Sequence, residues 1–378
     1  EIFLCFNPNS YSYNEHRTTH HEPLTTNLEP RNTNHEKRTT NHEPRTTNHE
    51  PRTTKHEPRT TNHEPRTTNH EPRTTNHEPR TNMFDYFDYD YPLYRPPSEA
   101  RSQIFQITLG CSQNHCTFCG MYKTKHFKVR PVADISTEIL HVPAGHRQHI
   151  RRVFLADGDA LIYPQSGLAE ILDLLADHFP NLNRVGIYAS PNSLKSKSVA
   201  ELTLLREKKL RILYFGLESG DAQTLSAVRK GFTPGEMMSH CRRAQQAGMK
   251  LSVTAILGLA GRERSREHAR ATAGWITELS PEFFSLLTMF RRHNDDFLRS
   301  ITPLTNGEII QEAVEIVRHL APQKTILRSN HVSNILHLAG SYPKDREKII
   351  IQAEQALAHA RQDPGWFNEV PDYSEENF

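Results

Sequence analysis

Short apolar runs recur at regular intervals from about residue 100 onward, each between four and seven residues long. Runs of this length, rich in branched and aromatic residues, are typical of buried β-strands. They predict strands at Ile104–Leu109, Arg152–Leu155, Arg184–Tyr188, Arg211–Gly216, Leu251–Leu257 and Phe283–Met289.

The stretches between these runs carry apolar residues at the spacing of an α-helix. Leu168, Ile171, Leu172 and Leu175, for example, would share one helical face. The spacing predicts helices at Asp134–Leu140, Gly167–Phe179, Ser198–Lys208, Pro234–Ala247 and Ser265–Glu278. Alternating strands and helices imply parallel strands joined by right-handed crossovers, and therefore an α/β fold. Six such units fit a partial (β/α)6 TIM-like barrel, although a doubly wound open sheet has the same rhythm.

The first part of the chain, residues 1–82, lacks such a pattern. From Thr18 to Arg80 it repeats a seven-residue unit nine times, and eight of the nine units have Pro at the same position. Leu24 and Leu28 are the only aliphatic residues between Glu15 and Asn82. Because Pro breaks helices and so little apolar surface cannot offset chain entropy, we expect a disordered low-complexity segment.

A perfect short repeat is also what a tandem DNA repeat produces when it is translated in frame. The chain begins at Glu1, and Met83 follows directly after the last repeat unit. We therefore expect residues 1–82 to be upstream sequence and the protein to start at Met83.

The remaining chain divides into three predicted regions: a lead-in at 83–100, a core barrel at 101–290 and a C-terminal helical extension at 291–378. The extension has helical spacing at Asn306–Leu320 and Arg346–Ala360. Between them lies the polar stretch Arg328–Asn334, which would form either a capped loop or a lid over the barrel mouth that contacts substrate.

Composition excludes several classes of protein. The formal net charge is only +2, so the chain lacks the strong basic footprint of many nucleic-acid-binding domains. No apolar run approaches the roughly 20 residues of a transmembrane helix. Its five cysteines include a cluster of three rather than spaced pairs, which fits a reducing cytoplasm.

That cluster has the spacing C-x4-C-x2-C, formed by Cys111, Cys116 and Cys119 directly after the first predicted strand. Three local thiolates are suited to an iron–sulfur cluster with one iron left open. Two alternatives are a zinc site completed by His115 and ordinary thiols. A disulfide framework would leave one of the three unpaired, and Cys241, inside a predicted helix, is expected to be packing.

Polar or glycine-containing segments also follow the other predicted strands, at Ala156–Ala160, Ala189–Ser193, Leu217–Asp221 and Gly258–Glu263. Each could be an ordinary turn or helix cap. In a parallel α/β fold, however, these segments would meet at the carboxyl ends of the strands, where ligands bind.

The ordered series of cysteine loop and strand-end segments over residues 100–290 resembles the radical S-adenosylmethionine (radical SAM) enzymes. The resemblance implies the partial barrel fold, a [4Fe–4S] cluster on Cys111, Cys116 and Cys119, and SAM bound to the fourth iron. The usual spacing is C-x3-C-x2-C, so this chain has one extra residue, and His115 stands where the second cysteine would ordinarily fall.

The same resemblance implies cofactor-binding roles for residues at each strand end. Asp159 with its neighbouring glycine would receive the SAM amino group, and Glu218 with Ser219 would lie near the ribose. The basic residue near the SAM carboxylate would be Lys230 or Arg229. Phe118 and Gly258 would lie beside the adenine. Gly158 belongs to the segment that would receive the SAM amino group.

On this resemblance, the protein is an enzyme that cleaves SAM reductively and forms a 5′-deoxyadenosyl radical, which acts on an unknown substrate. A reductant such as flavodoxin or ferredoxin would supply the electron. The alternatives are a non-catalytic iron–sulfur electron carrier or sensor, and a zinc-stabilised binding module. The strand-end segments favour the enzyme, because a carrier has no use for them.

We predict that a protein starting at Met83 will melt at the same temperature and bind the same amount of iron as the full chain. The repeat has almost no apolar surface to bury, so it should add no stability. Thermal denaturation and iron analysis of both forms test this. A clearly lower melting temperature of the shorter form would show that residues 1–82 contribute structure.

Overall fold

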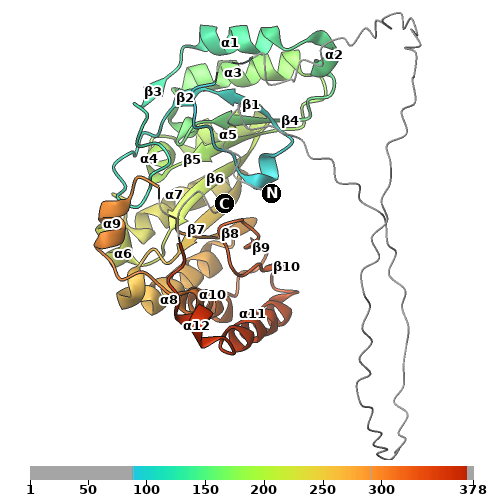
Figure 1. Ribbon diagram of the computed structural model, residues 1–378. Coiled ribbons are helices and arrows are strands. Elements are labelled where there is room, and N and C mark those ends of the chain that lie inside the picture. Colours follow the sequence, from blue (N-terminus) through green and yellow to red (C-terminus); the bar gives the residue numbers. More distant parts are fainter. Residues whose placement is uncertain (1–86, 88, 291, 373–378) are drawn as a thin grey trace, which may run out of the picture. The chain divides into compact units, whose positions relative to one another are not determined.

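The computed structural model describes residues 87, 89–290 and 292–372 (Figure 1). The heptapeptide repeat, its expected disorder and the expected start at Met83 lie outside the described residues. Within the described part, no helix is both long enough and apolar enough to cross a membrane.

An eight-stranded sheet forms the centre of the fold, in the order β1-β4-β5-β6-β7-β8-β9-β10. Neighbouring strands are parallel from β1 to β9, and β10 is antiparallel to β9. The strands are β1 Gln103–Gln106, β4 Arg152–Ala156, β5 Arg184–Ala189, β6 Leu210–Glu218, β7 Lys250–Leu257, β8 Phe283–Thr288, β9 Ile326–Arg328 and β10 Ala339–Ser341.

This strand order decides between the two architectures that the sequence left open. A doubly wound sheet reverses its strand order part-way and carries helices on both faces. Here the order follows the chain without reversal, so right-handed crossovers place successive helices on one face and curl the sheet. Figure 1 shows the helices along the outer side of the curved sheet. The α/β partial barrel prediction is confirmed.

The helices fall close to the predicted positions, and several begin at capping boxes that their sequences encode. Ser198, Thr233 and Thr305 each accept a hydrogen bond from a backbone N–H of the first turn, and a glutamate three residues on caps in return. The helical elements are η1 Pro97–Glu99, α1 Val132–His141, α2 Ala144–Arg147, η2 Ala160–Ile162, α3 Gln165–His178, α4 Pro191–Lys195, α5 Val199–Glu207, α6 Ala222–Ala227, α7 Pro234–Gln246, α8 Gly261–Leu279, α9 Asp295–Arg299, α10 Asn306–His319, α11 Arg346–Ala360 and α12 Pro364–Asn368.

Two local differences from the predicted elements affect the site. The first predicted strand is divided into β1 and β2 (Thr108–Leu109), and β2 leaves the main sheet to pair with β3 (Lys128–Val129). The C-terminal extension is largely helical as predicted, but it also adds β9 and β10 to the sheet. Each has only three residues, too few for an alternating pattern to be recognisable.

Strand β7 shows how the sheet separates its two faces. Leu251, Val253, Ala255 and Leu257 are at most 1% exposed and belong to the hydrophobic core. The residues between them point the other way and line a cavity on the inner face; they are Lys250, Ser252, Thr254 and Ile256. The outer face therefore supplies hydrophobic stability, and the inner face is left for polar groups.

Candidate functional site

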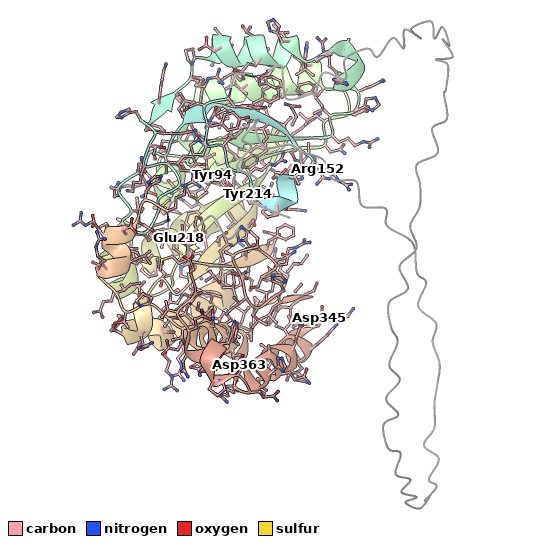
Figure 2. The ribbon with its side chains drawn as sticks, viewed as in Figure 1. Tyr94, Arg152, Tyr214, Glu218, Asp345 and Asp363 are labelled. Atoms are coloured by element: carbon pink, nitrogen blue, oxygen red, sulfur yellow. The ribbon has the colours of Figure 1, made fainter. Side chains whose placement is uncertain are left out.

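A cavity of about 920 Å³ lies on the inner face of the sheet, and the side chains of Cys111, Cys116 and Cys119 all line it. All three cysteines are free thiols. In Figure 2, Glu218 and Tyr214 mark the part of β6 that borders this cavity. The volume is near the upper end of the roughly 300–1,000 Å³ typical of small-molecule sites.

The cysteine loop connects β2 to β3 and is fixed by polar contacts rather than by regular structure. The Asn114 side chain donates to the Tyr122 carbonyl at 2.6 Å, and Lys123 Nζ donates to the Asn114 carbonyl at 2.8 Å. Thr117 N donates to the carbonyl of Val228 at 3.0 Å. These bonds join the loop to itself and to the segment after α6, so the three thiols are held in one place before any ligand binds.

Two buried carboxylates at the end of β4 hold the start of this loop. Asp157 Oδ2 accepts from Gly110 N at 3.0 Å and from Lys125 Nζ at 2.9 Å. Asp159 accepts from the Ser112 hydroxyl and from Ser190 N at 2.9 Å. Burial raises the pKa of Asp157 to about 6, and it also raises the pKa of Asp159.

Gly158, between these carboxylates, has no room for a side chain. A Cβ there would lie 2.6 Å from the Tyr122 ring and 2.8 Å from Cys111 Cβ. Glycine is therefore required for the end of β4 to approach the cysteine loop this closely.

An apolar cluster separate from the main core covers the loop. Cys116 and Phe118 pack in it with Val228, Leu259, Met289, Phe297 and Leu298. Burial raises the pKa of each of the three thiols, to about 11 for Cys119, so without a bound metal they are protonated at neutral pH.

Glu218 and Lys230 form an ion pair beside the thiols, with 2.9 Å between Oε1 and Nζ. Both line the cavity, whereas Arg229 is exposed and does not. Burial lowers the pKa of Lys230, but the Glu218 carboxylate and the neighbouring cysteines together raise it more, so the ammonium stays charged. The pair offers a cation and an anion to one ligand.

A second buried polar group lies behind the cavity, at the ends of β6 and β7. Ser219 Oγ is 2.8 Å from His268 Nδ1, and Glu312 of α10 accepts from Gly258 N at 2.7 Å and from the Ser265 hydroxyl. Burial lowers the pKa of His268 to about 4 and raises that of Glu312 to about 7. The C-terminal extension thus fixes the turn after β7.

The sequence profile of the Radical SAM superfamily matches residues 105–276, the segment that contains the cysteine loop and the strand ends just described. The chain contains a radical SAM domain. The cofactors of radical SAM domains are a [4Fe–4S] cluster and S-adenosylmethionine.

Curated relatives match over the same part of the chain. A tRNA-2-methylthio-N(6)-dimethylallyladenosine synthase from Hahella chejuensis is 28% identical over 178 residues, 44% of this chain and 38% of that protein. One of the same name from Saccharophagus degradans is 26% identical over 178 residues, 45% of this chain and 38% of that protein. The match therefore spans less than half the length of these relatives.

Among solved structures, coproporphyrinogen III oxidase (HemN) from Escherichia coli, a radical SAM enzyme, aligns with a TM-score of 0.45. It is 18% identical, and the alignment covers 57% of this chain and 52% of that one. The FeFe-hydrogenase maturase HydG from Carboxydothermus hydrogenoformans aligns with a TM-score of 0.42. It is 14% identical, and the alignment covers 66% of this chain and 56% of that one.

The residues present fit the family's cofactors. In the described part of the chain, no three His, Cys, Asp or Glu side chains are grouped to hold a single metal ion. A [4Fe–4S] cluster places each thiolate on a different iron, which suits three thiols that line one cavity. Beside the cysteines, the buried Thr117 Oγ1 and Gln113 Oε1 have no hydrogen-bond partner among the described residues.

The cofactor-binding residues predicted from sequence divide into two groups. Phe118, Gly158, Glu218 and Lys230 line the cavity with the cysteines. Asp159, Ser219 and Gly258 do not line the cavity and instead hydrogen-bond to Ser190, His268 and Glu312, respectively.

Sequence patterns did not identify the cavity-lining hydroxyls of β7 and β8, nor Glu312. The two-residue spacing of the hydroxyl residues along the strands could have indicated that they share the inner face of the sheet. Glu312 had none, because it approaches Gly258 only through the folding of a distant helix.

Glu312 generates a pH prediction. Because its folded pKa is raised from 4.5 to about 7, the folded state keeps a proton that the unfolded state releases over that range. The carboxyl's contribution to the free energy of unfolding is therefore complete below pH 4.5 and is lost as pH rises through 7. Wild type should therefore lose this contribution between pH 5 and pH 8, whereas Glu312→Gln should not. The melting temperature of Glu312→Gln minus that of wild type should rise by on the order of 5 °C over this range.

Differential scanning fluorimetry at both pH values measures this change. Glu315→Gln serves as the control, since that side chain lies on the same helix but pairs with Arg270. If the melting temperatures of Glu312→Gln and wild type differed by the same amount at both pH values, the raised pKa of Glu312 would be contradicted.

Proposed function

We propose that this chain is an enzyme that cleaves SAM reductively and applies the resulting 5′-deoxyadenosyl radical to a substrate in the cavity of the barrel. The observation that carries the proposal is that three free thiols and the Glu218–Lys230 pair line one cavity with space for a further molecule. The bound cluster would supply the electron that breaks a carbon–sulfur bond of SAM.

In this proposal Cys111, Cys116 and Cys119 hold three irons and leave the fourth for the amino and carboxylate groups of SAM. The apolar cluster around Cys116 and Phe118 keeps water from the cysteine loop. Asn294 supports this arrangement, because its side chain donates to the Phe118 carbonyl at 2.8 Å.

The ion pair would orient SAM. Lys230 has three N–H donors, so it can keep its bond to Glu218 and still donate to the SAM carboxylate. Glu218, an acceptor, suits a ribose hydroxyl. Asp159, Ser219 and Gly258, predicted from sequence to bind SAM, would support the site through their hydrogen bonds to Ser190, His268 and Glu312.

The cavity favours an enzyme over the two other functions considered. An electron carrier or sensor needs no space beside its cluster, and the described residues form no single-ion zinc group. The enzyme needs a one-electron reductant, for which a flavodoxin or ferredoxin is suited. We do not propose a tRNA substrate for this chain, because the relatives whose names include tRNA match it only over the radical SAM part.

The first test of this function is reductive SAM cleavage without substrate. Anaerobically reconstituted protein, given dithionite and SAM, should slowly release 5′-deoxyadenosine, measured by liquid chromatography. The thiols and the ion pair are already in place, so cleavage needs no further component. A cluster-loaded protein that released none, and whose spectrum did not respond to SAM, would exclude the proposal.

Cluster content tests the ligands. Iron and sulfide should each reach about four per chain, and changing any one loop cysteine to Ala should abolish stable loading. Cys241→Ser is the matched control and should keep the cluster, because Cys241 is buried in α7.

His115→Ala tests the extra residue in the cysteine spacing. His115 is exposed, so this variant should load a cluster and cleave SAM like the wild type. If His115→Ala lost the cluster while Cys116→Ala kept it, the loop would use a Cys-His-Cys ligand set, and the assignment would be wrong.

A further inference from the structure

The cavity changes character along the strands of the barrel. On the inner face of β7 the sequence of side chains from the amino-terminal to the carboxyl-terminal end is Lys250, Ser252, Thr254 and Ile256. At about 3.3 Å per residue this stripe is about 20 Å long. Ile256 lies beside the apolar cluster around Cys116, so the cation is at the end away from the cysteines.

Neighbouring strands extend the charge at that end. Arg152 of β4 and Arg184 of β5 are direct partners in the sheet register, and Lys250 is paired with Ile212 of β6, next to Arg211. Each of the four basic residues lines the cavity, as does Arg328 of β9. Figure 2 shows Arg152 well separated from Glu218, with Tyr214 between them.

Most of this charge has no counter-ion. Glu99 neutralises Arg184, with 2.6 Å between Nη1 and Oε1. In the described part of the chain, none of the ion pairs or side-chain hydrogen bonds involves Arg152, Arg211, Lys250 or Arg328. Glu218, the acidic residue among those that line the cavity, is at the far end and already paired with Lys230. Four cations without a counter-ion among the described residues therefore line one end of the cavity.

The middle of the cavity is also prepared for a polar ligand. The hydroxyls of Ser252, Thr254 and Ser285 face the cavity, and within the described residues they make no hydrogen bond to protein. Inward polar groups left without partners cost stability unless water or a ligand satisfies them.

We propose that the amino-terminal end of the barrel cavity binds the anionic group, phosphate or carboxylate, of a small-molecule substrate. The anion would contact Arg152, Arg211, Lys250 and Arg328, and the hydroxyl row would bind polar groups in the middle of the molecule. The carbon to be attacked would then point toward the cysteine loop. This deepens the proposed function, but anion binding itself can be measured without any SAM chemistry.

A small molecule fits the observations better than a nucleic acid. The cations line one end of a single cavity of about 920 Å³, where Arg211, Lys250 and Arg328 are also open to solvent, so a small anion can reach all of them from one side. The whole chain has a net charge of only +2, so it lacks the extended basic face that a phosphodiester backbone needs.

Isothermal titration calorimetry with tripolyphosphate and with citrate tests the proposal on the cluster-loaded protein in low salt. One site per chain is expected for at least one of the two anions, and the tighter one identifies phosphate or carboxylate as the ligand group. Arg152→Gln and Lys250→Gln should each weaken binding about tenfold or more, because each removes a charge-assisted hydrogen bond.

Arg151→Gln is the matched control. Arg151 is exposed, adjacent to Arg152 and absent from the cavity wall, so its loss removes the same charge without removing a contact. It should leave anion binding unchanged. Arg211→Gln repeats the test at an exposed position if another variant fails to fold, as judged by its melting temperature.

Three results would overturn the proposal: no saturable binding of either anion, equal weakening by Arg151→Gln, or binding of a single-stranded RNA oligonucleotide at this row without binding of the small anions. These outcomes are separate from failure of the proposed function, because that failure appears as absent 5′-deoxyadenosine while anion binding persists.

Discussion

The arrangement of the site depends on the two buried carboxylates at the end of β4. Asp157 binds the backbone N–H of Gly110 where the cysteine loop begins, and Asp159 joins Ser112 of that loop to Ser190 at the end of β5. Hydrogen bonds to charged groups contribute about 1.5–3 kcal/mol each. Since the cysteine loop has almost no regular structure, these contacts determine where its thiols lie relative to the sheet.

The C-terminal extension completes the site from the opposite side. Glu312 holds the turn after β7 through Gly258, and Asn294 holds the cysteine loop through the Phe118 carbonyl. Phe297 and Leu298 of α9 contribute to the apolar cluster over Cys116. The extension lies beyond residues 105–276, which match the superfamily profile. The matched segment alone would therefore lack part of the cover over its cysteines and the support of its β7 turn.

Sequence patterns predicted the parts of the fold that depend on local periodicity. The six core strands and the helix at 346–360 fall where the apolar spacing placed them, because burial of one face imposes that spacing directly. The cysteines, Glu218 and Lys230 were recognisable because they follow strand ends, and strand ends of parallel strands meet in space.

What could not be predicted depends on contacts between distant segments. Strands β9 and β10 have three residues each and exist only because β8 provides an edge for pairing. Asp159 binds Ser112 of the cysteine loop and Ser190 at the start of α4, and no sequence pattern indicated either contact. Type and spacing of residues indicate which groups are near the cavity, but hydrogen-bond partners decide which of them face it.

The two faces of β7 show how the domain reconciles stability with an open interior. A barrel whose interior is packed with aliphatic residues gains stability from both faces of its strands. Here Ser252 and Thr254 occupy inner positions, so the hydrophobic gain comes from the outer face, where Val253 and Leu257 pack in the core. At about 25 cal/mol per Å² of buried apolar surface, the inner hydroxyls forgo stabilisation that aliphatic side chains would provide. Lys250 of the same stripe has no ion-pair partner among the described residues, so the inner face is better explained as a binding surface than as a core.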